Sequence, residues 1–159
     1  MYWKELRQSG EIFEYLPEIW QHEQGMPRWF RDSSKTWTHD MEDWRDFLDG
    51  VYLAYGLFDD QELTICMYFE QRGNEQTLEM HLSTLRRVAP ADFIQACIQL
   101  RDRLFRQGVK QITGWLLAKN FVLGRLLRQI GFKPIGLDMD CGESHGRPLR
   151  WHLWEAETL

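Results

Sequence analysis

The sequence is poor in cysteine, and its three cysteines form no recognisable pattern. Cys66, Cys97 and Cys141 are odd in number and widely spaced. A disulfide framework needs an even set, and a structural zinc site needs closely spaced pairs of ligands. We therefore expect reduced, mostly buried thiols, no metal site and a cytoplasmic location.

The sequence also lacks a long hydrophobic run and an excess of basic residues. No stretch approaches the 18 or more apolar residues that are typical of a membrane-spanning helix, and the first residues lack the apolar segment of a secretory signal. The formal net charge of −5 argues against general binding of phosphate backbones, which requires a basic surface. We therefore expect no contact with membranes or nucleic acid.

Tryptophan, in contrast, is abundant in the N-terminal third. Five of the eight tryptophans fall in the first 44 residues: Trp3, Trp20, Trp29, Trp37 and Trp44. In residues 1–50 we expect a short strand and two helices. The first helix is capped by Ser9 and is kinked or split at Pro17, and the second is capped by Asp40.

After residue 50 the hydrophobic period changes from helical to strand-like. The expected elements, in order, are strands 51–58, 63–69 and 77–85, a helix from 92 to 108, a strand 109–117, a helix 120–130, and strands 132–141 and 149–155. The chain, 1–159, is long enough for one domain and shows no linker. The sequence therefore predicts an α+β domain whose mostly antiparallel sheet has six or seven strands and about four flanking helices.

The segment from Asn120 to Phe132 carries the most specific pattern. An asparagine is followed by apolar residues three, six and seven positions later and by Gly-Phe at eleven and twelve: Asn120, Leu123, Leu126, Leu127, Gly131 and Phe132. Any short amphipathic helix that ends at glycine would meet most of this pattern. Together with the order of elements, however, it resembles the GNAT superfamily of N-acetyltransferases, and the resemblance covers nearly the whole chain.

The resemblance implies an acyl-CoA N-acyltransferase fold that binds acetyl-CoA or a related acyl-CoA. Residues 1–50 would form the wall of the acceptor site, and residues 51–159 the sheet and the cofactor cleft. The cofactor would lie between two separating strands, one ending near Leu85 and one starting at Val109. Its arm would pair with the backbone from Leu82 to Leu85 and contact Asn120. Its pyrophosphate would lie at a helix N-terminus, which is a favourable anion site.

The turn that would hold the phosphates departs from the family pattern Arg/Gln-x-x-Gly-x-Gly/Ala. Here Arg86 is followed by Ala89 and Ala91 where small residues are needed, and alanine is tolerable only at negative φ. Pro90 lacks an N–H, and we expect Asp92 to cap the helix and occupy its first amides. Arg86 and the adjacent Arg87 would compensate by pairing directly with phosphate. The alternative is an ordinary solvated charged turn.

The catalytic groups also depart from the family. Leu127 stands where many members place a tyrosine general acid, so Tyr68, or Tyr55 on a neighbouring strand, is a candidate substitute. Glu79 and His81 alternate onto one strand face near the place where the family positions its general base. The alternative is that this face simply points to solvent.

Two functions follow. The first is an acyl-CoA-dependent N-acyltransferase acting on a small-molecule or protein amine. The second is an inactive GNAT-fold binding or structural protein, as among phage-type relatives, that uses a Trp-rich surface to bind a protein partner. A homodimer is a further expectation. The acidic and aromatic residues before position 45 suit a cationic amine, but they also suit plain packing.

Overall fold

The computed structural model describes residues 1–24, 40–117, 120–144 and 147–157. Its elements, in chain order, are β1 (Tyr2–Glu5), η1 (Glu11–Tyr15), α1 (Leu16–Gln24), α3 (Met41–Gly50), β2 (Leu53–Asp59), β3 (Glu62–Arg72), β4 (Asn74–Thr84), α4 (Pro90–Arg106), β5 (Gln111–Leu117), α5 (Phe121–Ile130), β6 (Lys133–Ser144) and β7 (Arg147–Glu157). None of the helices in these ranges is long and apolar enough to cross a membrane.

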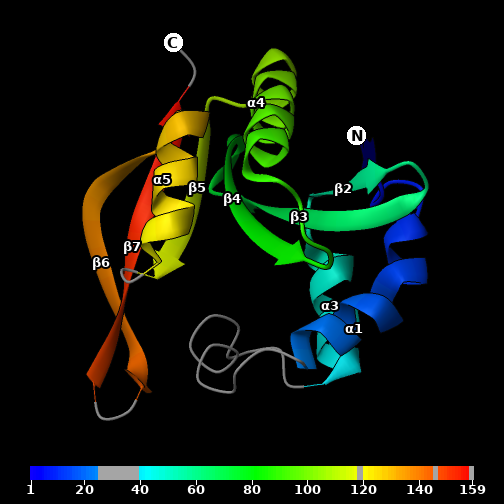
Figure 1. Cartoon of the computed structure of the whole chain (residues 1–159), viewed down its shortest axis with the longest axis horizontal. Coiled ribbons are helices and arrows are strands. Elements are labelled where there is room, and N and C mark those ends of the chain that lie inside the picture. Colours follow the sequence, from blue (N-terminus) through cyan, green and yellow to red (C-terminus); the bar gives the residue numbers. More distant parts are fainter. Residues whose placement is uncertain (25–39, 118–119, 145–146, 158–159) are drawn as a thin grey trace.

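The strands form one seven-stranded sheet in the order β1-β2-β3-β4-β5-β7-β6 (Figure 1). Strand β4 pairs with β5 in parallel, and the other neighbours pair antiparallel. A helical crossover through α4 makes the parallel pair possible, as it does in βαβ units. The predicted α+β fold is confirmed: in the described residues a mostly antiparallel sheet is flanked by four α-helices.

The two faces of the sheet are covered by different helices. Helices α4 and α5 cover one face, and η1, α1 and α3 cover the other, on the opposite side of β3 (Figure 1). Because side chains alternate along a strand, β3 sends Ile65, Met67 and Phe69 to the α4 face and Cys66 and Tyr68 to the other. Each face therefore has its own buried core.

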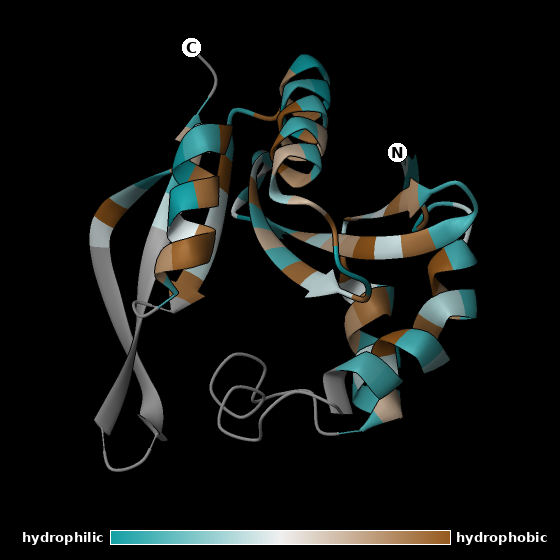
Figure 2. Cartoon of the chain, viewed as in Figure 1, coloured by the Kyte–Doolittle hydropathy of each residue, from teal (hydrophilic) through white to brown (hydrophobic). Residues whose placement is uncertain are grey.

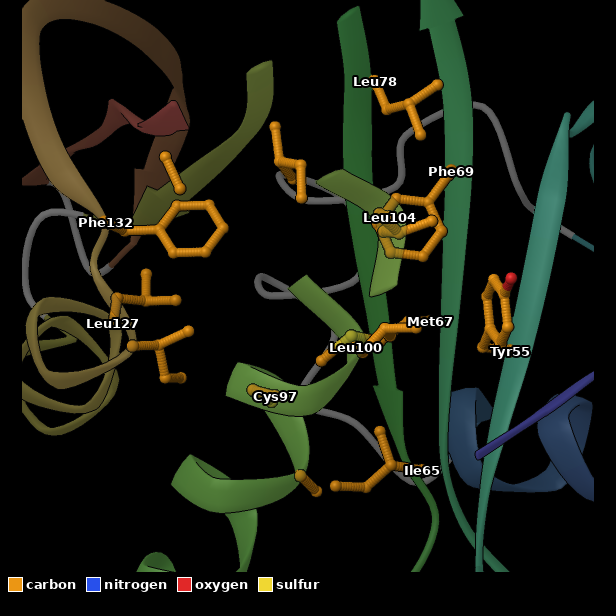
Figure 3. Close-up of a cluster of buried hydrophobic side chains, with 14 of the residues drawn as sticks. Tyr55, Ile65, Met67, Phe69, Leu78, Cys97, Leu100, Leu104, Leu127 and Phe132 are labelled. Atoms are coloured by element: carbon orange, nitrogen blue, oxygen red, sulfur yellow. The ribbon is translucent and has the colours of Figure 1, made fainter. Parts of the chain in front are cut away.

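The core under α4 is the larger of the two. Leu100 and Leu104 of α4 lie against Met67 and Phe69 of β3 (Figure 3). Figure 2 shows that α4 and α5 each carry hydrophobic and hydrophilic residues, as expected for helices that cover a sheet with one face.

The local capping signals near the N-terminus were predicted with mixed success. The predicted cap of α3 by Asp40 is confirmed. Asp43 completes a reciprocal capping box, which was not predicted. The helix containing Pro17 is split, because a 3₁₀ turn precedes α1. The prediction that Ser9 caps this segment is wrong, since Gly10 takes the cap position with a left-handed backbone at φ 75°. Glycine suits that conformation better than serine does.

Candidate functional site

Strands β4 and β5 pair over a short distance and then separate. The parallel ladder runs from Thr77 to Glu79 on β4 and from Gln111 to Thr113 on β5. Beyond it, β4 stays paired with β3 up to Thr84 and β5 with β7 up to Leu117, and the two strands diverge (Figure 1). The predicted separation of these strands is confirmed.

The two leucines predicted to pair with a cofactor lie at the diverging end of β4. The side chain of Leu82 packs against the α4 core, and its backbone follows the end of the β4–β5 ladder. The amide of Leu85 donates to the carbonyl of Thr64 at 2.8 Å, so only its carbonyl oxygen is left for another partner. Their pairing with a ligand stays a prediction.

The N-terminus of α4 follows directly and differs from the expectation. Its N-cap is Ala89, with no side-chain capping bond, and Pro90 occupies the first helical position. The prediction that Asp92 caps this helix is wrong, because Asp92 lies within the first turn. The absent N–H of proline costs nothing there, since a first-turn amide has no helical partner. The amides of Ala91 and Asp92 are therefore not used by a side-chain cap.

The backbone of this turn tolerates its alanines. Ala89 has φ −60°, and of the described non-glycine residues only Asp60 has a positive φ. The glycines of the family pattern are thus not required for this turn's backbone. Ala89 and Ala91 are both exposed.

The two arginines of the turn have different surroundings. The guanidinium of Arg86 lies 3.1 Å from a carboxylate oxygen of Glu18 on α1 and 3.6 Å from one of Glu62. Arg87 is exposed and forms no ion pair with any residue that the structure describes. Arg86 therefore ties the turn to α1, whereas Arg87 is the cation of the turn that is available to an anion.

Asn120 caps α5 beside the end of β5. Its side-chain Oδ1 accepts from the amide of Leu123 at 3.2 Å. This bond uses the oxygen and leaves the Nδ2 group as the donor that Asn120 can offer to a ligand. Phe121 and Val122, in the same first turn, are exposed, whereas Leu127 is buried in the core.

A cluster of four charged or titratable side chains lies on the opposite face of the sheet from α4. Arg72 donates to Oε2 of Glu79 through Nε at 2.9 Å and also through Nη2. Nε2 of His81 lies 2.7 Å from Oε1 of Glu70 and 3.5 Å from Oε2 of Glu79. We call these residues, Glu70, Arg72, Glu79 and His81, the charge cluster.

Glu79 and His81 of the charge cluster are largely covered, whereas the side chain of Arg72 is half exposed. Only 7% of Glu79 is exposed, and the ring of Phe47 on α3 lies edge-on to His81 with centroids 5.4 Å apart. The alternative in which Glu79 and His81 sit on a solvent-facing strand side is therefore wrong. Helix α3 covers this face.

Burial and the neighbouring charges shift the pKa values of Glu79 and His81. Burial raises the pKa of Glu79, but hydrogen bonds from His81 and Arg72 outweigh it and lower the pKa to about 2. Burial lowers the pKa of His81, but its bonds to Glu70 and Glu79 outweigh burial, so the pKa of His81 is raised. Glu79 is thus a firmly ionised carboxylate and a weak base, whereas His81 readily holds a proton.

Comparison with known proteins bears on the fold. The sequence matches no protein-family model and no curated protein. A spermidine N-acetyltransferase chimera from Vibrio cholerae and hSSAT superimposes with a TM-score of 0.75 at 11% identity, covering 98% of this chain and 94% of that one. The ribosomal-protein-alanine N-acetyltransferase from Brucella melitensis gives 0.71 at 13% identity, covering 99% and 100%. An acetyltransferase from Bacillus subtilis in complex with CoA gives 0.58 at 14%, covering 72% and 82%.

The chain has the GNAT acyltransferase fold.

Within the GNAT fold, only two of the four residues of the charge cluster were predicted from the sequence. Glu79 and His81 were predicted site residues, but Glu70 and Arg72 were not. The available signal was the turn at Gly73, because the hairpin it forms places Glu70 directly opposite Glu79. Two like charges opposite each other are unfavourable unless cations lie beside them. Arg72 and His81 supply those cations.

The charge cluster also has the donor types of a metal site. Glu70, Glu79 and His81 each offer a ligand atom, and these atoms lie within 4.8 Å of one another. However, Arg72 already places two donors on Oε2 of Glu79, which is the oxygen nearest to His81. A metal ion would have to displace the guanidinium, so the donor set fits an ion-pair network better than a metal centre.

Tyr68, the predicted substitute acid, lies in the core between β3 and α3. It is fully buried, with Trp44 and Phe47 around its ring, and it pairs across the ladder with His81. Its role as an acid stays a prediction.

Cys66 and Cys97 are buried, and burial raises the pKa of each thiol to about 12, as expected for inert thiols. The side chain of Cys141 lies outside the described residues.

Two of the N-terminal tryptophans take structural roles. Trp44 is buried in the core under α3, and Trp3 donates its indole N–H to the carbonyl of Ala96 at 2.7 Å. Packing is therefore the role of these two residues. Trp29 and Trp37 lie outside the described residues.

Proposed function

We propose that the protein is an acyl-CoA-dependent N-acyltransferase that acts on an amine. The observation that carries the proposal is the separation of β4 and β5 beside an α4 N-terminus without a side-chain cap. Free first-turn amides and the helix dipole favour an anion there. A GNAT-fold structure bound to CoA supports the choice of ligand.

The residues of the β4–α4 turn fit a pyrophosphate. The amides of Ala91 and Asp92 and the guanidinium of Arg87 supply donors on one exposed segment. Backbone groups from Leu82 to Leu85 and Nδ2 of Asn120 would hold the pantetheine arm. Arg86 would contribute charge while still bound to Glu18. When bound, acyl-CoA supplies an activated thioester carbonyl for attack by the amine.

His81 is the better of the two proposed bases. An amine must lose a proton to attack a carbonyl, and the base that takes it should have a pKa not far below the working pH. Glu79 fails this condition because its pKa is lowered to about 2. The pKa of His81 is instead raised above its ordinary value of 6.5, so His81 binds the amine proton more strongly than Glu79 does. Leu127 cannot protonate the leaving thiolate, so Tyr68 or water takes that role.

The acceptor is proposed to be a small-molecule or protein amine of cationic character. Solved proteins of the same fold include one named for spermidine and one for a ribosomal-protein alanine. Helices α1 and α3 carry Glu18, Glu42, Asp43 and Asp46 and cover the sheet face that holds His81. Carboxylates near the site attract a positively charged acceptor.

Calorimetric titration with CoA and acetyl-CoA tests the proposal. We expect a Kd below about 1 mM for the wild type. Arg87→Gln should weaken binding about tenfold, since a charge-assisted hydrogen bond contributes about 1.5 kcal/mol or more. The matched control is Arg106→Gln, on the exposed last turn of α4, which should bind like the wild type. No binding by a folded wild-type protein up to about 1 mM would reject the function.

A further inference from the structure

We propose that Glu70 and Arg72 are positioning residues for His81, and that they act on its proton in opposite directions. The inference rests on the proposed function, in which His81 takes a proton from the amine. It adds two residues that lie on β3, outside the strand that carries the base.

The hairpin register brings the four side chains of the charge cluster together. Glu70 is opposite Glu79, and Tyr68 is opposite His81. Arg72 follows a register shift in the ladder, and its guanidinium reaches Oε2 of Glu79. A pair of facing carboxylates is thus flanked by a guanidinium toward the turn and an imidazole on the other side. The distances of 2.7 Å to 3.7 Å between partners place all four in one network.

Glu70 fixes which nitrogen of His81 can accept a proton. An ionised carboxylate is an acceptor only, so Nε2, 2.7 Å from Oε1 of Glu70, must carry a hydrogen. In the neutral ring, Nδ1 then holds the lone pair. The edge-on ring of Phe47 packs against the imidazole from α3 and limits its rotation. The amine proton would move to Nδ1, and Nε2–H would stay bonded to Glu70.

The surrounding charges then determine how stable the imidazolium of protonated His81 is. Glu70 and Glu79 stabilise it, and Arg72 opposes it by neutralising the same carboxylates. Of the described residues, Glu70, Arg72, Glu79 and Tyr68 lie around His81 on β3 and β4, and α3 contributes the uncharged ring of Phe47. Loss of Glu70 should therefore lower the pKa of His81, and loss of Arg72 should raise it.

The test compares Glu70→Gln with Arg72→Gln by two readouts. NMR titration of the His81 ring gives its pKa directly, and the pH dependence of kcat/KM gives the acid limb of turnover. We expect both to move about one unit down in Glu70→Gln and about one unit up in Arg72→Gln. Arg72→Lys, which keeps a charge, should move them less. The ring nitrogen shifts of the wild type should identify the Nε2–H tautomer.

The matched controls are Glu157→Gln and Arg106→Gln, which change exposed charges at the ends of β7 and α4. They should leave both readouts in place. Shifts of the same sign in Glu70→Gln and Arg72→Gln, no shift in either folded variant, or an Nδ1–H tautomer would overturn the proposal. A moved ring pKa with an unmoved acid limb would also overturn it, because His81 would then not be the proton acceptor. Absence of CoA binding instead rejects the proposed function, and the positioning role falls with it.

Discussion

The two faces of the β3–β4 hairpin carry opposite chemistry. Toward α4, Met67, Phe69 and Leu78 form part of a continuous apolar core. Toward α3, near the turn, the same strands present Glu79 and His81 with their β3 partners. Because alternate side chains of a strand point to opposite faces, neighbouring residues serve different purposes here. One face stabilises the hairpin, and the other holds ionised groups in a fixed arrangement.

The energetic terms on the two faces also differ. Burial of an apolar side chain is favourable wherever water is excluded. Burial of a charge is unfavourable unless a partner compensates it, so the charge cluster depends on every one of its members. We therefore expect the apolar face to respond to lost volume and the polar face to lost pairing.

Leu78→Ala should have the largest effect on stability. Leu78 is fully buried on the α4 face, so truncation leaves a cavity and should cost about 3 kcal/mol of unfolding free energy. Urea denaturation measures the change. The control is Val122→Ala, since Val122 is 64% exposed and its truncation should change little. Equal losses in the two variants would mean that the α4 face is not a tightly packed core.

On the polar face, the two members of one ion pair should behave unequally. Arg72→Gln leaves the buried carboxylate of Glu79 with His81 as its remaining cationic partner, and we expect a loss of about 2 kcal/mol. Glu79→Gln leaves a half-exposed arginine that can turn to water, so the loss should be about 1 kcal/mol. Thermal unfolding at neutral pH measures both. The double variant should be little worse than Arg72→Gln alone.

The contributions of Glu79 and His81 to stability depend on pH in opposite directions. The pKa of Glu79 is lowered in the fold, so its contribution is present above its ordinary value of 4.5 and is lost as the pH falls toward about 2. The pKa of His81 is raised, so its contribution is present below 6.5 and is lost as the pH rises through its folded value. The difference between wild type and Arg72→Gln should accordingly shrink in acid. A difference that grows in acid would contradict the ion-pair assignment.

The apolar face was predictable from sequence, and the polar face only in part, because Glu79 and His81 were expected but Glu70 and Arg72 were not. The strand alternation from Leu78 to Leu82 and the pattern from Asn120 to Phe132 are local, so both could be read directly. The burial of Glu79 depends on α3, which is distant in sequence, and the pairing with Glu70 depends on hairpin register. Neither is set by the residues next to Glu79.

The prediction that Asp92 caps α4 was wrong for a different reason. Aspartate is a strong N-cap former, so Asp92 was a reasonable expectation. Pro90, however, is favoured at the first helical position, and this moves the start of the helix back to Ala89. The correct cap is a residue with no capping side chain. Two local preferences competed, and only the structure decides between them.

The smallest effect concerns Asn120, where stability and ligand binding are separated within one side chain. Its Oδ1 caps α5, so Asn120→Ala should cost about 1 kcal/mol of stability. Asn120→Asp keeps a capping oxygen, and its stability should match the wild type within a few tenths of a kcal/mol. Aspartate lacks the Nδ2 donor, however, so CoA affinity should fall in both variants. Denaturation and calorimetry on the same preparations separate the two roles. If Asn120→Asp binds CoA as the wild type does, Asn120 serves only as a cap, and the contact with the cofactor arm is lost from the proposal.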